Sequence, residues 1–205
     1  MSTGFQLWLA AGKVFHGWCL SRNGQWVQGI PLLQEGIASV RTTGCNLLLP
    51  FFLTRFAEAY RLAGQFSEGL ERLAEAFEVV KNTRECWAQA DMHQLRGTLL
   101  VDLNEQGAAE ESYQRALAVA HGQSAKFWEL RAATSLARLW RDQGKRTEAR
   151  DLLSPVYNWF TEGLDTPVLM EARALLDELG IERRLQNADP QGRAWSSARS
   201  SPRGR

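Results

Sequence analysis

The sequence has no uninterrupted apolar stretch long enough to cross a bilayer. Its longest apolar run, residues 47–53, is interrupted by Pro50, whereas a membrane-spanning helix needs roughly 20 predominantly apolar residues. A signal peptide is also missing, because no basic segment precedes the apolar residues 5–11 and no convincing cleavage site follows them. We therefore expect a cytoplasmic protein that does not associate with a membrane.

Cysteine and histidine are scarce, and their spacing argues against two common uses. The 3 cysteines include no CxxC pair, and this odd count indicates neither a disulfide framework nor a zinc cluster. None of His16, His93 and His121 has a histidine or cysteine four residues further along, the spacing that would place two metal ligands on one helix face. The sequence predicts no metal site.

Motifs for catalysis are missing as well. A P-loop needs GxxxxGK followed by Ser or Thr, and neither of the two Gly-Lys pairs, at residues 12–13 and 144–145, meets that pattern. No strand-rich segment carries paired aspartates for metal-dependent nucleotide chemistry, and no GxSxG elbow or nearby histidine would activate Ser135. We expect no catalytic residue and no cofactor, and hence a protein that is not an enzyme.

Net charge is small, because 24 Lys and Arg residues face 23 Asp and Glu residues. Residues 181–205 nevertheless hold six arginines against Glu182 and Asp189, a net +4 that leaves −3 for residues 1–180. The body therefore lacks the basic surface that nucleic acids need. The Arg/Ser-rich tail has the composition of a disordered segment, and a solvated tail is favoured over an arm for nucleic acid or anionic lipid. We expect a folded domain over residues 1–180 and a disordered tail over residues 181–205.

An internal repeat is the main feature that the sequence does contain. Gly24, Gly64, Asn104 and Gly144 are spaced at intervals of 40 residues. Small residues recur seven positions before and five positions after each of them, namely Gly17, Ala57, Gly97 and Ala137, and then Gly29, Gly69, Ala109 and Ala149. A period of this length with helical spacing on both sides of a turn is typical of stacked helix pairs. We expect the helices of each pair to cross closely at the small residues.

The pattern predicts an all-α solenoid of four antiparallel helix pairs and a final capping helix. The expected pairs cover residues 5–22 and 26–42, residues 50–63 and 66–82, residues 86–103 and 108–121, and residues 126–143 and 146–160. The capping helix is expected over residues 167–179, with Thr166 as its N-cap and Gly180 at its end. Its charged residues would leave one polar face, as a terminal repeat requires.

The series of small, bulky and turn residues resembles the tetratricopeptide repeat (TPR) over about residues 1–160, although the usual unit has about 34 residues. The fourth unit, with AATSLARLW at 132–140, GK at 144–145 and PVY at 155–157, is similar to the C-terminal TPR region of bacterial multidomain regulators. Those regulators carry adenylate or guanylate cyclase or ATPase domains. The resemblance implies a role in signal transduction, with any catalytic domain upstream.

In a stack of this kind, the first helix of each pair lines a concave groove. We expect the partner-binding residues to be Trp18, Arg22, Arg61, Gln94, Arg131, Arg138 and Arg141. The last three arginines share roughly one helical face, and their mutual repulsion favours an acidic or C-terminal carboxylate ligand. The alternative is that Glu129, Asp142 and neighbouring helices neutralise this face. The tryptophan of the set is either an anchor for a peptide side chain or part of the core.

The first expected helix is apolar around much of its perimeter. Phe5, Leu7, Trp8, Leu9 and Phe15 occur on it with few charges, so an isolated chain would leave apolar surface in water. We expect an upstream domain or a second copy of the chain to cover it.

The leading interpretation is a protein–protein interaction scaffold that binds a peptide or protein in the concave groove and performs no catalysis itself. The alternative is a regulatory or sensor fragment of a multidomain cyclase- or ATPase-type signalling protein.

Overall fold

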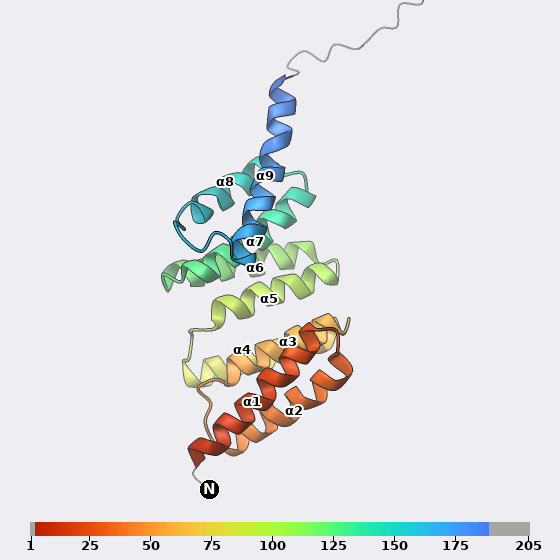
Figure 1. Ribbon diagram of the computed structural model, residues 1–205, viewed down its shortest axis with the longest axis vertical. Coiled ribbons are helices and arrows are strands. Elements are labelled where there is room, and N and C mark those ends of the chain that lie inside the picture. Colours follow the sequence, from red (N-terminus) through yellow and green to blue (C-terminus); the bar gives the residue numbers. More distant parts are fainter. Residues whose placement is uncertain (1–2, 189–205) are drawn as a thin grey trace, which may run out of the picture.

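All regular structure in the described part of the chain is helical (Figure 1). The computed structural model describes the backbone of residues 3–188 and the side chains of residues 5–180. The helices are α1 (Thr3–Arg22), α2 (Trp26–Thr42), α3 (Leu49–Leu62), α4 (Phe66–Thr83), α5 (Gln89–Asp102), α6 (Gln106–Gly122), α7 (Lys126–Asp142), α8 (Arg146–Tyr157) and α9 (Pro167–Ala188). The predicted all-α class, with four helix pairs and one further helix, is confirmed.

Each helix pair turns through one residue in the left-handed conformation. The φ angles are 80° at Gly24, 74° at Gly64, 63° at Asn104 and 80° at Gly144. Glycine adopts positive φ without a Cβ clash, and asparagine tolerates it because its short polar side chain can bond locally. The four residues that define the repeat in the sequence are therefore the residues at which the backbone reverses.

A second set of left-handed residues lies where one pair leads into the next. Gly44 has φ 72°, Arg84 59° and Ser124 54°, and these positions are again 40 residues apart in the sequence. Only the first of them is a glycine, so residue type alone did not reveal this second turn. The backbone repeat is more regular than the sequence repeat.

The small residues lie where paired helices approach most closely. A Cβ atom added to Gly17 would lie 2.6 Å from the carbonyl oxygen of Gly29 and 2.8 Å from the backbone nitrogen of Leu33. One added to Gly69 would lie 3.2 Å from the carbonyl oxygen of Ala57. Since side chains of ordinary size would force these helices apart, the predicted close crossing is confirmed in the first two pairs.

The odd-numbered helices form one layer of the stack and the even-numbered helices form the other (Figure 1). Each odd-numbered helix contacts the next odd-numbered one, from α1 to α9, whereas α2, α4, α6 and α8 contact only odd-numbered neighbours within the described residues. Three clusters of buried apolar residues follow one another along the stack, and Leu70 and Leu117 each pack against two of them. Neighbouring repeats thus bury each other's apolar faces, as in other solenoids.

Helix α9 closes the stack but is longer than predicted. Its residues Leu169, Ala172 and Leu175 are buried against α7 and α8, which is the packing of a cap. The predicted end at Gly180 is wrong, because the helix continues to Ala188. A glycine within a helix costs only about 1 kcal/mol relative to alanine, and good helix formers flank this one. Residues 189–205 of the predicted tail lie outside the described residues.

Other boundaries differ by a few residues. Thr166 directly precedes α9, but its hydroxyl donates to the carbonyl oxygen of Gly163 at 2.7 Å, so the predicted side-chain N-cap is replaced by a turn contact. Helix α5 begins at Gln89 and α8 ends at Tyr157, three residues inside the predicted limits at both positions. These differences leave the stacking of the pairs unchanged.

Candidate partner-binding face

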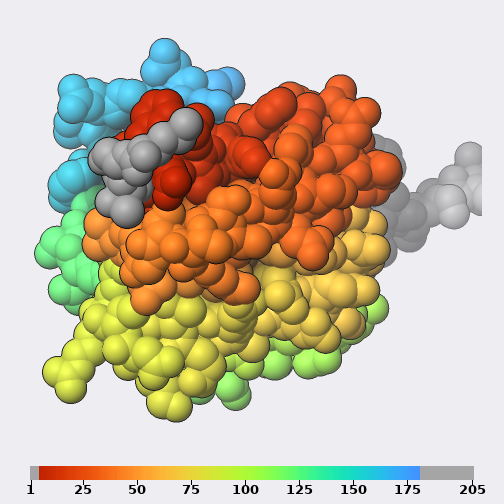
Figure 2. Space-filling view, turned by 90° about the horizontal axis from the view of Figure 1, so that it is seen from below, coloured from red at the N-terminus to blue at the C-terminus, as the bar shows by residue number. Residues whose placement is uncertain are grey.

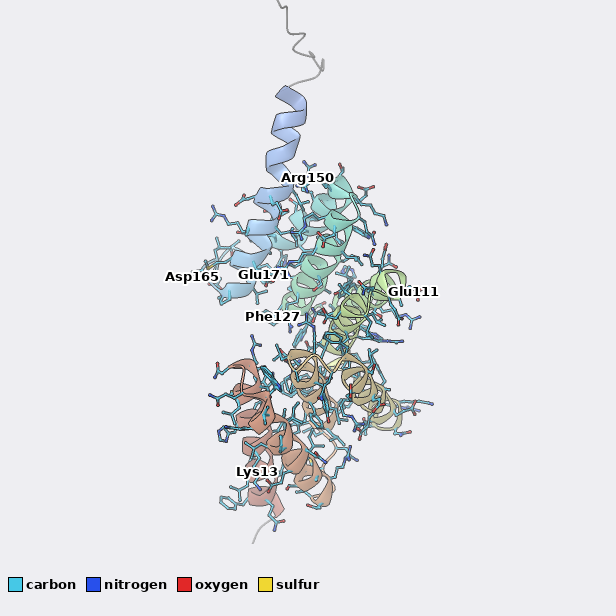
Figure 3. The ribbon with its side chains drawn as sticks, turned by 90° about the vertical axis from the view of Figure 1, so that its right-hand side faces the viewer. Lys13, Glu111, Phe127, Arg150, Asp165 and Glu171 are labelled. Atoms are coloured by element: carbon cyan, nitrogen blue, oxygen red, sulfur yellow. The ribbon has the colours of Figure 1, made fainter. Side chains whose placement is uncertain are left out.

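The odd-numbered helices present a polar inner face, and α1 and α9 project on the same side of the molecule (Figure 3). Polar side chains on successive odd-numbered helices contact one another at nearly equal repeat positions. Trp18 Nε1 donates to Glu58 at 2.9 Å, across 40 residues of sequence. Gln94 Nε2 donates to the hydroxyl of Ser135 at 2.9 Å, across 41 residues. The inner face is therefore a ladder of contacts between repeats.

An ion-pair cluster is buried beneath the middle of this face. Arg55 of α3 and Asp91 of α5 are only 5% and 1% exposed and form an ion pair. Arg131 of α7 reaches the other carboxylate oxygen of Asp91 at 3.0 Å, and Arg55 Nη1 forms an ion pair with Glu58 Oε2 at 3.0 Å. Burial raises the pKa of Asp91, while the two arginines oppose that shift. The cluster links three successive helices of the inner layer.

Aromatic rings cover the guanidinium groups of this cluster. The guanidinium carbon of Arg55 lies 5.3 Å from the ring centroid of Trp18 and 4.9 Å from that of Phe51. Arg131 lies 5.1 Å from the ring of Trp128 in the same way. These distances fit cation–π interactions, which gain strength as water is excluded. Trp18 is thus half-buried and belongs to the inner face and to the edge of the core at once.

The predicted residues in the first two pairs lie along this ladder. Arg22 Nη1 lies 3.3 Å from the carboxylate of Glu58 and its guanidinium lies 5.5 Å from the ring of Trp18. Arg61 Nε donates to Asp102 at 2.6 Å. Both arginines are therefore paired with an acid on the next odd-numbered helix.

The three arginines of α7 are paired as well. Arg131 contacts Asp91, Arg138 contacts Glu171, and Arg141 lies 2.9 Å from Glu178. The repulsion expected among the arginines is therefore offset by acids on α5 and α9, so repulsion no longer argues for an acidic ligand.

Asp142 and Glu129, the two acids expected to neutralise the arginine face of α7, have different ion-pair partners. Asp142 pairs with Arg141 at 2.9 Å. Glu129 pairs instead with Lys126 at 2.7 Å and lies 3.6 Å from His121. Most of the neutralisation of α7 thus comes from neighbouring helices rather than from α7 itself.

A small pocket of about 130 Å³ opens between α5, α7 and α9. Three of the seven predicted site residues, Gln94, Arg131 and Arg138, line it together with Ser135 and Glu171. Its walls offer guanidinium and amide donors and one carboxylate. The ion pair between Arg138 and Glu171 is exposed, since 40% of the Arg138 side chain and 48% of the Glu171 side chain are accessible to solvent. A competing carboxylate can therefore reach it. Trp18, Arg22, Arg61 and Arg141 do not line this pocket.

Exposed apolar side chains mark the starts of the inner-layer helices. Leu47, Trp87 and Phe127 are 63%, 42% and 51% exposed and are spaced by 40 residues. Phe127 lies on the side toward which α1 and α9 project (Figure 3). Trp87 stacks on Phe51 at a centroid distance of 5.4 Å. These residues provide apolar contact area at one edge of the inner face.

Sequence reasoning missed the central members of the ion-pair cluster, Arg55 and Asp91. One observation in the sequence was available: Asp91 and Arg131 carry opposite charges at equivalent repeat positions, and such positions are neighbours in a stack. No comparable sign identified Arg55, because its partner Asp91 is offset by 36 residues rather than 40.

No helix among residues 3–188 is long and apolar enough to span a membrane. No group of three or more His, Cys, Asp or Glu side chains in this part of the chain is placed to hold a metal ion.

Comparison with known proteins identifies the fold. No family model and no curated protein matches the sequence. The solved structure of a putative kinesin light chain with nearly identical TPR-like repeats, from Podosopora anserina, has a TM-score of 0.66 at 18% identity, covering 88% of this chain and 89% of that one. BtubC (BKLC) from P. vanneervenii has a TM-score of 0.55 at 14% identity, covering 98% of this chain and 97% of that one. The chain therefore has the fold of a TPR-like repeat solenoid.

Proposed function

We propose that the protein is an interaction scaffold whose inner face binds a protein or peptide, and that it performs no catalysis of its own. The observation that carries this proposal is the pocket between α5, α7 and α9, where Gln94, Arg131 and Arg138 converge from two helices. An acidic side chain or a C-terminal carboxylate of the partner would enter this pocket. Guanidinium groups recognise carboxylates by charge-assisted hydrogen bonds.

The partner carboxylate would exchange with Glu171. An exposed ion pair contributes only about 0.2–1 kcal/mol, so Arg138 can leave Glu171 at small cost. Arg131 would stay in place, because the buried carboxylate of Asp91 holds it at 3.0 Å. One fixed and one exchangeable arginine make a preformed site that still admits a ligand.

The rest of the partner would follow the inner face toward α1. Arg61 lies along that path, and Trp18 and Arg22 form its far end around Glu58. Arg141 lies beside α9 at the opposite end. Exposed Phe127 and Trp87 at the edge would add apolar contacts, and aromatic residues are common anchors in protein interfaces. We place the protein in the cytoplasm, with no nucleic acid or membrane as its partner.

The test is selection of peptides with free C-termini from a library, followed by affinity measurements with three proteins. We expect wild type to enrich acidic C-terminal sequences and the double variant Arg138→Glu/Arg141→Glu to bind them about tenfold or more weakly. Arg150→Glu is the matched control, since Arg150 lies on α8 and, among the described residues, forms an ion pair only with its sequence neighbour Asp151. Equal affinity of the double variant and wild type, or no enrichment of acidic sequences, would contradict the proposal.

We also propose that a neighbour covers the outer surface of α1. Phe5, Trp8 and Leu9 are 59%, 68% and 54% exposed at the end of the stack formed by α1 and α2 (Figure 2). An apolar surface of this kind marks an interaction site. An upstream domain of a cyclase- or ATPase-type signalling protein, or a second copy of the chain, would fill this role.

Sedimentation velocity distinguishes these neighbours. If a second copy covers α1, the wild type dimerises with increasing concentration and Trp8→Glu/Leu9→Lys stays monomeric. If an upstream domain covers it, the isolated chain stays monomeric and binds an apolar dye through α1. A monomer that binds no dye would refute both forms of the proposal.

A further inference from the structure

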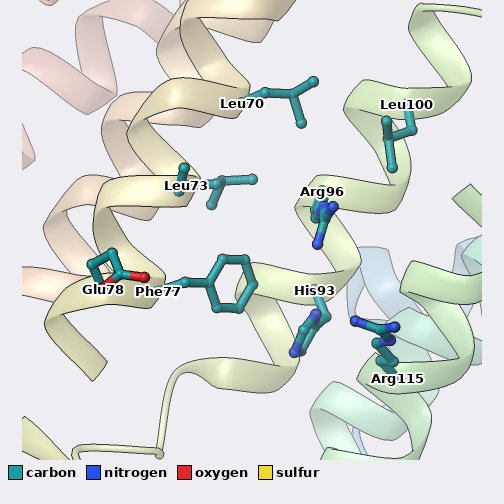
Figure 4. A pocket seen from close by; sticks show the side chains of 9 residues that line it. Leu70, Leu73, Phe77, Glu78, His93, Arg96, Leu100 and Arg115 are labelled. Atoms are coloured by element: carbon teal, nitrogen blue, oxygen red, sulfur yellow. The ribbon is translucent and has the colours of Figure 1, made fainter. Parts of the chain in front are cut away.

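A second cleft lies on the outer side of the stack, between α4, α5 and α6 (Figure 4). Its volume is about 570 Å³, which falls within the range of roughly 300–1,000 Å³ typical of small-molecule sites. His93, Arg96 and Leu100 line it from α5, and their spacing of three and four residues places them on one helix face. Gln94, which lines the inner pocket, lies on another face of the same helix. The cleft is therefore separate from the proposed partner site.

The two ends of the cleft differ in chemistry. Leu70 and Leu100 lie at one end, whereas His93 and Arg115 lie at the other (Figure 4). Between them, the ring of Phe77 lies 4.7 Å from the ring of His93, centroid to centroid. The cleft thus joins an apolar surface to a cationic end.

Within the described residues, the two arginines that line the cleft have no acidic partner. The side chains of Arg96 and Arg115 make no ion pair or hydrogen bond with any described residue, in contrast to the paired arginines of the inner face. Glu78 is the acid that lines the cleft, and it lies 3.6 Å from Lys81. Two unpaired guanidinium groups at the edge of an apolar cleft are a ready site for an anion.

His93 adds a third polar group without a partner. Its Nδ1 atom is buried and makes no hydrogen bond to any residue of the described chain. Burial, and then Arg115 and Arg96, lowers the pKa of His93 to about 4. The charged groups that face this ring are Glu78 from α4, Arg96 from its own helix and Arg115 from α6. A bound anion would counter the two arginines and supply the hydrogen-bonding partner that Nδ1 lacks.

We propose that this cleft binds a small amphipathic carboxylate, with its carboxylate between Arg96 and Arg115 and its apolar chain or ring over Phe77, Leu70 and Leu100. The chain itself offers no better occupant. Residues 189–205 contain four arginines and only Asp189 as an acidic side chain, so they share the sign of the cleft. Residues 3–22, which include the exposed apolar helix, contain no acid at all. Charge complementarity therefore favours a separate anionic ligand over the tail or over the apolar helix α1 of a second copy.

Decanoate is a suitable probe, and decyltrimethylammonium, with the same chain and the opposite charge, is its control. In a titration followed by calorimetry and by the ring signals of His93, we expect decanoate to saturate one site and to raise the pKa of His93. The double variant Arg96→Gln/Arg115→Gln should bind decanoate about tenfold or more weakly, and Arg150→Gln should bind it like wild type. Neither cleft arginine has a side-chain partner among the described residues, so the double variant should keep its helical circular dichroism.

Three outcomes would overturn the proposal. They are no saturable binding of decanoate, equal affinity in the double variant, and equal binding of decyltrimethylammonium with the same changes at His93. Trp8→Glu tests whether decanoate binds instead to the apolar surface of α1. Binding there would weaken in this variant, whereas binding in the cleft would not. Arg138→Glu/Arg141→Glu should leave decanoate affinity unchanged, so failure here is distinguishable from failure of the partner site.

Discussion

Arg131 Nη1 lies 3.0 Å from Oδ1 of Asp91, the residue 40 positions earlier in the sequence. The contact joins equivalent positions of successive repeats, on α7 and α5. Trp18 and Glu58 are related in the same way, at 2.9 Å and the same separation. At these two positions, equivalent residues of successive inner helices are therefore in direct contact.

Removing the shared carboxylate of this cluster should be costly. We expect Asp91→Ala to lower the free energy of unfolding by about 3 kcal/mol, because a buried guanidinium loses its main partner. This loss lies near the lower end of the roughly 3–5 kcal/mol expected when a buried ion pair is broken, since Arg55 keeps its ion pair with Glu58 at 3.0 Å. Urea denaturation measures the change. As a control, Asp151→Ala breaks the exposed ion pair with Arg150 and should change the free energy of unfolding by less than about 0.5 kcal/mol. Equal losses of stability in both variants would contradict this account.

Two glycines of α1 should respond to alanine in opposite directions. Gly17→Ala should destabilise the protein by about 1–3 kcal/mol, because the added Cβ would lie 2.6 Å from the carbonyl oxygen of Gly29 in α2. Gly12→Ala should stabilise it by about 0.5–1 kcal/mol, since nothing lies within 4 Å of the added Cβ and alanine is the better helix former. Thermal unfolding compares the two, and a shift of the same sign in both would show that helix crossing does not explain the small residues.

The glycine positions show why most of the fold was predictable. Positive φ favours Gly or Asn at the turns, and close helix crossing favours Gly or Ala. Both constraints can therefore be recognised from the residue types in the sequence. Gly180 satisfies neither constraint, because it lies within α9 and a Cβ added there would meet nothing within 4 Å. Arg84 and Ser124 adopt the left-handed conformation without being glycine. The end of α9 and the second set of turns therefore could not be predicted from residue type.

The left-handed positions lead to a prediction of their own. Ser124→Gly should raise stability by about 0.5–1 kcal/mol, since it removes the cost of φ 54° for a residue with a Cβ. Asn104→Ala should lower stability by about 1 kcal/mol, because alanine tolerates φ 63° less well than asparagine does. Both changes are measurable by chemical denaturation. If Ser124→Gly were the more destabilising of the two, the conformational explanation would be wrong.

His93 should make the stability of the protein depend on pH. Its pKa is about 4 in the folded chain and 6.5 as a free group, so the unfolded chain binds more protons between these values. The contribution of His93 to the free energy of unfolding is therefore complete above pH 6.5 and is lost as the pH falls toward 4. The whole shift corresponds to about 3 kcal/mol, and solvent at the half-buried ring screens this to about 1–2 kcal/mol.

The variant His93→Gln isolates this contribution. Urea denaturation at neutral pH and at successively lower pH values should show a smaller loss of stability on acidification in the variant than in wild type. An identical loss in both proteins would mean that His93 is not the group responsible.

The candidate site was less predictable than the fold. Helical spacing placed Gln94, Arg131 and Arg138 on the inner layer, and they do line one pocket. The pairing of the inner-face arginines with acids depends on how far successive helices are displaced. The observed separations range from 33 residues for Arg138 and Glu171 to 41 for Arg61 and Asp102. This displacement follows from three-dimensional packing rather than from the period, so the sequence period could indicate the Asp91–Arg131 pair but not the ion pairs with other separations.

Hydrogen exchange of the wild-type protein, with and without a selected acidic peptide, tests the central claim most directly. If the inner face is the binding surface, amide exchange should slow in α5, α7 and α9 around the pocket of Gln94, Arg131 and Arg138. Slowing confined to α2, α4, α6 and α8, or no change at saturating peptide, would contradict the assignment of the inner face as the partner site.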